Sequence, residues 1–351
     1  MIYRNISISL KNFNFVNQYN WQLSVLEFFR RNLFLNSLML LPYTLMVRIE
    51  SLLHADQPTY ASDISPFIAW TNEIIPSLLV QNLLACILVF LQAVYINKIV
   101  IKHRINVQIT LWPGLVYILL CSIVPQCTYL SAVLIANLFI LIAFSDIFKI
   151  YKRPFAIKFI FNSGIFISIS AMIYPPYIAY LLTGFIGLSI IRSFKTKEML
   201  QYLSGILVPF MLFGSWTFYC GTFQEKMVGL VKVKFGFSSD IMPTDTNGYI
   251  FIGLIFLFII IAIFSYNSYS IKKRIQVQKK INILFWMILS ALIALFISDS
   301  LSIDHLLMLS APLGILLSMN LLKIKSTIFP ELIHLGIIIL IFVLHFKILI
   351  L

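Results

Sequence analysis

Charged residues are scarce in this chain of 351 residues: they make up 11% of it, whereas 60% of the residues are hydrophobic. A soluble domain does not have enough interior to bury that fraction, since average usage is roughly 45–50% by a similar count. The apolar residues come in blocks of about 17–22, long enough to cross a hydrocarbon core of roughly 30 Å. The scarcity of charge therefore excludes an ordinary soluble domain and predicts an all-α polytopic membrane helix bundle.

Common catalytic motifs are also missing. The sequence contains no P-loop, GxSxG, HExxH or CxxC pattern, so we expect no ATP-driven role and no metal site. Its four cysteines, Cys86, Cys121, Cys127 and Cys220, lack metal-binding spacing. A disulfide between Cys127 and Cys220 stays open as an alternative, because both fall near the same predicted membrane face. We expect no cleavable signal peptide, because the first apolar run follows a polar start and no small-residue cleavage site follows it.

The apolar blocks predict about eleven membrane helices, which we place at residues 32–52, 76–97, 107–124, 128–147, 157–174, 176–192, 200–219, 248–266, 282–299, 305–322 and 331–350. Prolines mark several of the turns, notably Pro125 and the pair Pro175 and Pro176. The hairpins at Pro125 and Pro175 are so short that the helices beside them can be tilted or only partly spanning. A count of nine or ten helices is therefore the alternative.

Basic residues indicate the orientation of these helices. Lys and Arg gather in cytoplasmic loops of membrane proteins. If the N-terminus is cytoplasmic, every even-numbered connection is basic and every odd-numbered connection is not, and most of the 26 basic residues lie inside. The inner set is Arg4, Lys11, Arg30, Arg31, Lys98, Lys102, Arg104, Lys149, Lys152, Arg153, Lys158, Arg192, Lys195, Lys197, Lys272, Lys273, Arg274, Lys279, Lys280, Lys323 and Lys325. A wrong helix count would break the alternation, so the count and the orientation support each other.

This distribution explains the net charge of +13 as a topology signal with attraction to the lipid bilayer, and it excludes a nucleic-acid partner. Residues 1–31 form a cytoplasmic or interfacial segment, either an amphipathic helix on the inner surface or a flexible start that continues into the first span. Residues 32–351 form a single transmembrane domain with long outside loops at 50–75 and 220–247. We expect the protein in the inner, or cytoplasmic, membrane of a bacterium.

Ionisable residues on the outer side give the candidate site. Asp304 and His305 lie at a tight turn between the ninth and tenth spans, where Asp304 can equally cap the helix that follows. The first outside loop carries Asp56 and Asp63 just after Arg48. The other long loop carries Lys232 and Lys234, cations on the side where the positive-inside rule disfavours them, which suits phosphate binding. Each feature alone also fits a solvated loop.

Two segments carry a resemblance: the acidic outside loop after the first helix, and DHLLMLSAPLGILLS, Asp304 to Ser318, at the start of a late helix. This layout resembles the C-type glycosyltransferases that use polyprenyl-phosphate-linked sugars. The resemblance implies Asp56 or Asp63 as a catalytic or metal-binding acid and His305 near the donor phosphate. The loop has no paired acids, and Asp304–His305 stands where that family has Arg-Tyr or His-Tyr. From FFRRNLFLNSLMLLPYTLMVR onward, the chain is also similar to an uncharacterised bacterial family of multi-pass inner-membrane proteins.

Three functions follow as hypotheses. The first is an enzyme of cell-envelope biogenesis that transfers a lipid-linked sugar on the outer face, with Asp56, Asp63 and His305 catalytic and with Arg48, Lys232, Lys234 and Asp304 binding substrate. The second is a non-catalytic scaffold that assembles other envelope membrane proteins, and the third is a glycolipid flippase. For the enzyme we expect spans one, seven, eight, nine and ten to surround one outward-facing cavity.

Overall fold

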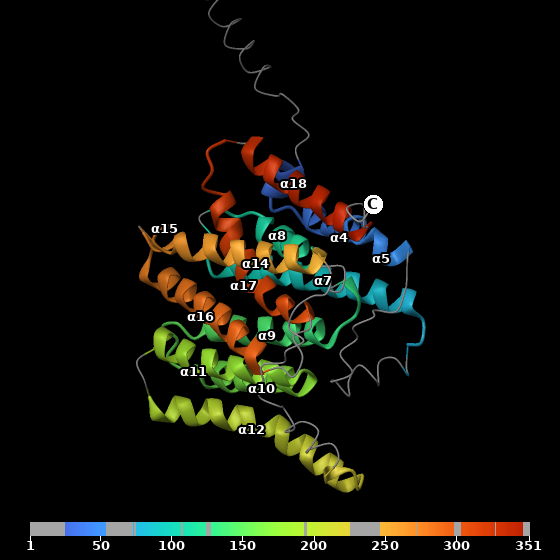
Figure 1. Ribbon diagram of the computed structural model, residues 1–351. Coiled ribbons are helices and arrows are strands. Elements are labelled where there is room, and N and C mark those ends of the chain that lie inside the picture. The colour runs from blue at the N-terminus through green and yellow to red at the C-terminus, as the bar shows by residue number, and fades with distance from the viewer. Residues whose placement is uncertain are drawn as a thin grey trace, which may run out of the picture.

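The computed structural model describes residues 25–53, 73, 75–106, 108–123, 128–192, 195–224, 246–271, 273–297, 303–326 and 328–346. Over these residues the fold is entirely helical, and the helices lie side by side in a layered bundle (Figure 1). The helices are α2 Val25–Arg30, α3 Phe34–Leu38, α4 Leu40–Val47, α5 Ile49–Leu53, α7 Leu78–Lys102, α8 Trp112–Ser122, α9 Ala132–Lys149, α10 Ile157–Ile173, η2 Pro175–Ala179, α11 Tyr180–Ile191, α12 Thr196–Tyr219, α14 Thr246–Phe264, α15 Tyr266–Ser270, α16 Ile275–Ile297, η4 Ile303–Leu306, α17 Leu307–Leu321 and α18 Ile328–His345.

A helix lies over each of the eleven predicted apolar segments. Five stretches of the described chain are long and apolar enough to cross a membrane. They are Leu78–Lys102, Ala132–Lys149, Thr196–Tyr219, Ile275–Leu295 and Ile328–His345. Shorter apolar helices, such as Trp112–Ser122 and Leu307–Leu321, lie beside them. The fold is therefore that of a membrane helix bundle.

Burial varies between the helices in the way their sequences suggest. Every residue of α8 is buried, and so is nearly all of α17, and these two helices pack on each other. Both are apolar around their whole circumference, as a helix at the centre of a bundle must be. By contrast, only 33% of the most apolar stretch of α12 is buried, and only 28% of that of α18. In Figure 1 these two helices form opposite edges of the bundle, where their large apolar side chains face outward.

Local sequence signals account for several helix ends. Pro113 lies in the first turn of α8, where its missing amide hydrogen costs nothing. Ser131 caps α9 by accepting a hydrogen bond from the backbone amide of Leu134 at 3.2 Å. Pro175 follows α10 and opens the 3-10 turn η2, so the predicted hairpin at this proline pair is confirmed. Gly221, at φ +71°, follows α12 in the left-handed conformation that glycine adopts without strain.

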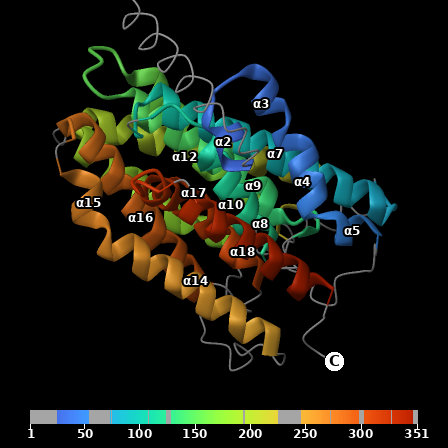
Figure 2. The ribbon, with the colours of Figure 1, turned by 90° about the horizontal axis from the view of Figure 1, so that it is seen from above.

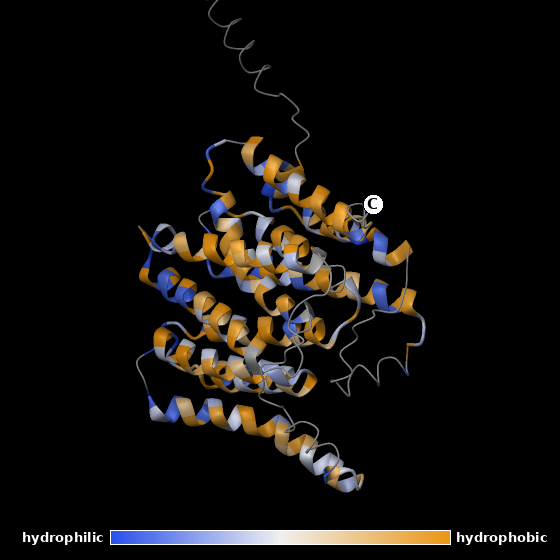
Figure 3. Ribbon diagram, viewed as in Figure 1, coloured by the Kyte–Doolittle hydropathy of each residue, from blue (hydrophilic) through white to orange (hydrophobic). Residues whose placement is uncertain are grey.

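The basic connections meet at one end of the bundle. Lys273 Nζ donates to the carbonyl oxygen of Ile105 at 2.8 Å, and Lys279 Nζ donates to that of Ile191 at 3.2 Å. Arg192 donates to the carbonyl oxygen of Arg153 at 2.9 Å, and Lys323 Nζ donates to that of Ser268 at 2.6 Å. Figure 3 shows the middle of most helices as hydrophobic and the hydrophilic stretches toward their ends. The end of the bundle at which the basic connections meet is called the basic end; it carries the loops after α7, α9, α11, α15 and α17.

The start of the described chain also lies at the basic end. Leu26 and Phe29 of α2 are buried, and their carbonyl oxygens accept hydrogen bonds from Trp112 Nε1 and from the amide of Leu111, at 2.9 and 3.0 Å. A break at residues 31–33 separates α2 from α3. Over its described part, the segment at 1–31 therefore packs on the bundle as a separate short helix.

Candidate functional site

The end opposite the basic loops, which we call the polar end, is organised around Arg48. Its side chain is fully buried at the end of α4. Nε donates to Ser122 Oγ at 3.0 Å, one terminal nitrogen donates to the carbonyl oxygen of Cys121 at 2.8 Å, and the other donates to that of Thr128 at 3.2 Å. Cys121 and Ser122 end α8, where the helix dipole and unpaired carbonyls favour a cation. Arg48 therefore fastens α4 to the end of α8.

His345, at the end of α18, joins the same group. Its Nε2 lies 2.9 Å from the carbonyl oxygen of Ser122, and its Nδ1 lies 3.7 Å from the carboxylate of Glu50. Ser51 donates to the carbonyl oxygen of Arg48 at 2.8 Å, and Asn82 Nδ2 donates to that of Ser51 at 2.7 Å. The polar end thus gathers one cation, one carboxylate and one imidazole, from the end of α4, from α5 and from α18.

His305 lies in η4 and is fully buried. Its Nε2 is hydrogen-bonded to the hydroxyl of Tyr174, the residue that follows α10. The ring of Tyr174 packs edge-on against Tyr177, which in turn lies 5.3 Å from Tyr180 between ring centres. Tyr180 donates to the carbonyl oxygen of Met308 at 3.0 Å. His305 is therefore part of a tyrosine cluster that holds the start of α17 against η2 and α11.

A third set of buried polar side chains was not predicted from the sequence. Tyr117 donates to Gln92 Oε1, and Gln92 Nε2 donates to the carbonyl oxygen of Leu134 at 2.7 Å. Asn137 Nδ2 lies 3.3 Å from the carbonyl oxygen of Leu307. Each is a single polar residue in an apolar run, and its partner is a main-chain or side-chain oxygen of another helix. The only sequence signal is the polar residue itself, which does not reveal that partner.

The remaining predicted site residues lie at or beyond the edge of the described chain. Asp56, Asp63, Lys232 and Lys234 lie outside the described residues. Asp304 is in η4, of which the structure describes only the backbone at this residue. The described residues that flank the first outside loop, Leu53 and Ile75, lie at the polar end. Leu53 is two residues after Ser51, which is hydrogen-bonded to Asn82, and the carbonyl oxygen of Ile75 accepts a hydrogen bond from Gln81.

The expected ring of spans one, seven, eight, nine and ten is wrong. The seventh span corresponds to α12, which packs on α10 and α11, whereas the first span corresponds to α3–α5, which packs on α7 and α8. Figure 1 places α12 and α4 at opposite edges of the bundle. The partners of α17 are instead α8, α16, α14 and α9. Loop composition gives the side on which a helix end lies, but it does not give the order of helices around the bundle.

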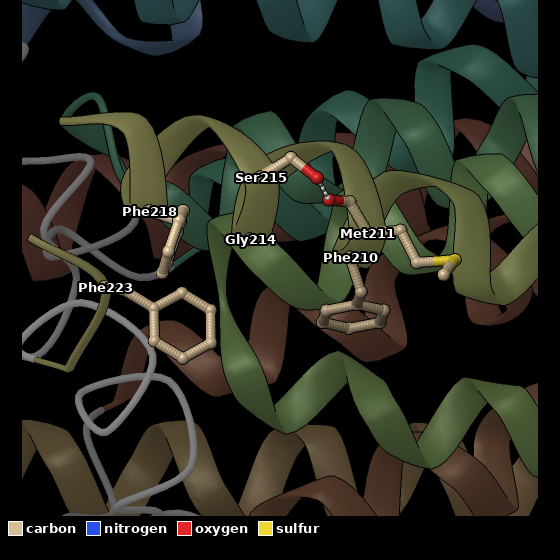
Figure 4. A pocket seen from close by; sticks show the side chains of 6 residues that line it. All are labelled: Phe210, Met211, Gly214, Ser215, Phe218 and Phe223. Carbon is tan, nitrogen blue, oxygen red and sulfur yellow. Dashed lines mark hydrogen bonds between the residues drawn. The ribbon is translucent and has the colours of Figure 1, made fainter. Parts of the chain in front are cut away.

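A recess of about 540 Å³ lies at the far end of α12 (Figure 4). It is lined by Phe210, Met211, Gly214, Ser215, Phe218 and Phe223. The hydroxyl of Ser215 donates to the carbonyl oxygen of Met211 at 2.8 Å and is therefore occupied within its own helix. The recess offers an apolar surface. Cys220, nearby in the chain, is an exposed thiol, and Cys127, its partner in the alternative disulfide, lies outside the described residues.

Within the described part of the chain, no three His, Cys, Asp or Glu side chains group so that they can hold a metal ion. Comparisons with protein-family models, with curated proteins and with solved structures found no match to this chain. The resemblances stated for the sequence therefore rest on its residues alone.

Proposed function

We propose that the chain is a multi-spanning protein of a bacterial inner membrane, with about eleven crossings and with its basic end in the cytoplasm. The support is the meeting of the basic connections through Lys273, Lys279, Arg192 and Lys323 at one end of the bundle. Lys and Arg near helix ends are retained on the cytoplasmic side. The polar end then faces the outside.

We further propose that the polar end transfers a sugar from a polyprenyl phosphate to an acceptor of the cell envelope. The observation that carries this proposal is the gathering of Arg48, Glu50 and His345 at the helix ends from which the first outside loop departs. In this reaction Asp56 or Asp63 takes the proton of the acceptor hydroxyl as the acceptor attacks the anomeric carbon. The sugar–phosphate bond breaks, and the polyprenyl phosphate leaves with the electron pair.

The cations have distinct roles in this proposal. Lys232 and Lys234 meet the charge of the leaving phosphate, Asp304 binds the donor, and His305, which is buried against Tyr174, holds the turn that carries Asp304. Arg48 is hydrogen-bonded to the end of α8 through Nε and one terminal nitrogen and to Thr128 through the other, so it acts mainly by fixing the end of α4 from which the loop begins. Its positive charge also raises the local potential for an anionic donor.

The direct test is the replacement of each acid by its amide. General-base assistance typically contributes about 10²–10⁴-fold in rate. Asp56→Asn or Asp63→Asn is expected to abolish the transfer of labelled sugar from polyprenyl phosphate in proteoliposomes, with protein abundance unchanged. Arg48→Lys is expected to weaken transfer more than Lys232→Arg, because lysine cannot reproduce three directed hydrogen bonds. Full activity of the Asp56→Asn, Asp63→Asn double variant would overturn the enzymatic proposal.

The second candidate function is a non-catalytic scaffold for other envelope membrane proteins. It is favoured by one observation: Arg48 and His305 are both fully buried against protein partners, as structural groups are. The exposed apolar face of α12, which includes Leu207, Met211 and Leu212, is then a contact surface for a partner helix. Loss of function on Leu207→Lys, with function kept in the double aspartate variant, would favour the scaffold.

A further inference from the structure

An apolar cavity lies in the half of the bundle nearest the basic end. Its volume is about 240 Å³, and its walls come from α2, α8, α14, α17, α18 and the turn after α17. Leu119, Phe258, Ile261, Leu317 and Ile337 are among the apolar lining residues, and Asn320 and His334 are the polar ones. Most of the lining residues lie toward the basic end, and Ile123, just after α8, is the one that lies nearest the polar end.

The cavity lies next to the outer surface of the bundle. Among the principal packing contacts of the described helices, α14 packs on α17 and α15, while α18 packs on α2, α4 and α8. Packing between α14 and α18 is not among these contacts, although both helices line the cavity. Figure 2 shows the two helices along one side of the bundle. A hydrocarbon chain of the surrounding bilayer can therefore reach the cavity between them.

Two polar groups in the cavity wall lack partners among the described residues. His334 is only 2% exposed, and its Nε2 is hydrogen-bonded to the hydroxyl of Tyr43 at 2.8 Å. Its Nδ1 has no partner there, and neither does Nδ2 of Asn320. Buried polar groups are nearly always hydrogen-bonded, and leaving one unpaired costs on the order of 1–3 kcal/mol. The cavity surface itself is apolar, so these two polar atoms do not face it.

The mouth of the cavity at the basic end carries positive charge. Lys323 and Lys325 flank the lining residue Ile324 and are exposed. Lys323 Nζ lies 4.7 Å from the ring centre of Tyr269 and donates to Ser268. Burial, together with the charge of Lys323, lowers the pKa of the neighbouring Lys273 to about 8. None of these lysines has a salt bridge within the described chain.

Two described acids lie near this mouth: Glu331, and Glu27, which follows the lining residue Leu26 and pairs with Arg30 at 3.4 Å. Glu331, one turn before His334, accepts a hydrogen bond from the amide of Val25 at 2.8 Å.

The apolar lining begins at Ile324, between the two lysines, and continues along α17 through Leu321 to Leu317. In a glycerophospholipid the acyl chains likewise lie below the phosphate. The order of cation and apolar wall therefore follows the order of groups in such a lipid.

We propose that this cavity holds part of one acyl chain of an anionic glycerophospholipid of the inner leaflet, with its phosphate at Lys323 and Lys325. The lipid fills the space between α14 and α18 and links these two helices. This inference does not depend on sugar transfer at the polar end, because the lipid site lies at the opposite end of the bundle.

Native mass spectrometry of the delipidated full chain tests the site. The probes are palmitoyl-oleoyl phosphatidylglycerol and the corresponding phosphatidylcholine at equal concentration. One bound phosphatidylglycerol is expected, with phosphatidylcholine at least about tenfold weaker, because each lysine near an anionic headgroup contributes on the order of 1 kcal/mol, about fivefold. The double variant Lys323→Gln, Lys325→Gln is expected to lose this preference. Equal binding of the two lipids to the native chain would overturn the proposal.

Variants that fill the cavity test the place of the acyl chain. Leu317→Trp is expected to abolish the bound lipid while thermal unfolding shows an intact fold. Should Leu317→Trp fail to fold, Ile261→Phe adds less volume at the wall that α14 forms and is expected to weaken binding by about tenfold or more. The matched control is Leu207→Trp on the exposed face of α12, which is expected to bind as the native chain does. Unchanged phosphatidylglycerol binding by a folded cavity variant would contradict the proposal.

Discussion

Arg48 donates a hydrogen bond from Nε to Ser122 Oγ at 3.0 Å, although the two residues are 74 positions apart in the chain. The contact joins the end of α4 to the end of α8, and His345 of α18 meets the same residue at its carbonyl oxygen. A buried guanidinium is stabilised only when its donors find acceptors. Here the acceptors are the hydroxyl of Ser122 and the carbonyl oxygen of Cys121 at the end of α8, with the carbonyl oxygen of Thr128 beyond it, so the arginine and the helix end satisfy each other.

This relationship predicts the effect of removing the guanidinium. Arg48→Met keeps an apolar side chain of similar length but leaves the oxygens of Cys121, Ser122 and Thr128 without this donor. We expect a loss of about 2–4 kcal/mol of stability, seen as a lower thermal midpoint in detergent.

The matched control for Arg48 is Arg31→Met, at an exposed position of the basic end. Surface substitutions usually change stability by at most about 0.5 kcal/mol. An equal effect of the two substitutions would show that the contacts of Arg48 do not hold the polar end together.

The attachment of α12 predicts a second effect. α12 packs chiefly on α10, where Gly164 and Gly205 let the two backbones approach. A Cβ at Gly164 would lie 2.5 Å from the carbonyl oxygen of Tyr202, and a Cβ at Gly205 would meet that of Phe161 still more closely. Small residues serve this purpose at helix contacts in membranes. Gly205→Val is expected to release α12, measured as faster cleavage of the α11–α12 connection by added protease.

Gly253→Val is the control for this experiment, because a Cβ at Gly253 in α14 meets nothing within 4 Å. It is expected to leave the cleavage rate at the native value. A native cleavage rate in the folded Gly205→Val variant would contradict the close-packing account of this contact.

His103 predicts a dependence of stability on pH. The residue follows α7 at the basic end, and Lys280 Nζ donates to its Nδ1 at 3.2 Å. Burial, aided by the charges of Lys280, Lys102 and Lys149, lowers the pKa of His103 from 6.5 to about 3. The folded chain therefore keeps a neutral imidazole where the unfolded chain is protonated. The contribution of His103 to the free energy of unfolding is complete above about pH 6.5. Below that pH it decreases by up to ~1.4 kcal/mol per pH unit.

The measurement compares the native chain with His103→Gln, which keeps an acceptor for Lys280, by thermal unfolding between pH 7 and pH 5. The native chain should lose stability relative to the variant as the pH falls. A constant difference across this range would show that His103 does not resist protonation.

The sequence predicted the positions of the helices because their apolar blocks and prolines are local signals. The turn at Pro175 lies where it was predicted, and the basic loops meet at one end of the bundle. Both features depend on residues within the turn or loop itself. The first predicted span, residues 32–52, is instead divided into α3, α4 and α5. Its last break falls at Arg48, whose partners lie on α8. That pairing is a tertiary relationship, which composition does not display.

The candidate site was predictable only in its general location. His305 and Arg48 were chosen because ionisable residues are rare in this chain, and both prove to be buried and hydrogen-bonded. Their partners, Tyr174 and the end of α8, were not predictable, because an uncharged tyrosine and a backbone carbonyl carry no distinctive sequence pattern. Lys280 was assigned to the cytoplasmic loops, yet it is 1% exposed and turns inward to His103.

The orientation of the bundle is tested most directly at the two ends of α12. The 24 residues of this helix span about 36 Å, enough to cross a membrane. In a Cys127→Ser background, the native Cys220 is an exposed thiol at the polar end, whereas Cys86 and Cys121 are buried. A second variant, Cys220→Ser with Lys195→Cys, places the exposed thiol at the basic end. In spheroplasts, a membrane-impermeant maleimide should label Cys220 at once and should label the Lys195→Cys variant only after permeabilisation. Labelling of both positions in sealed spheroplasts, or of the Lys195→Cys variant alone, would contradict the account.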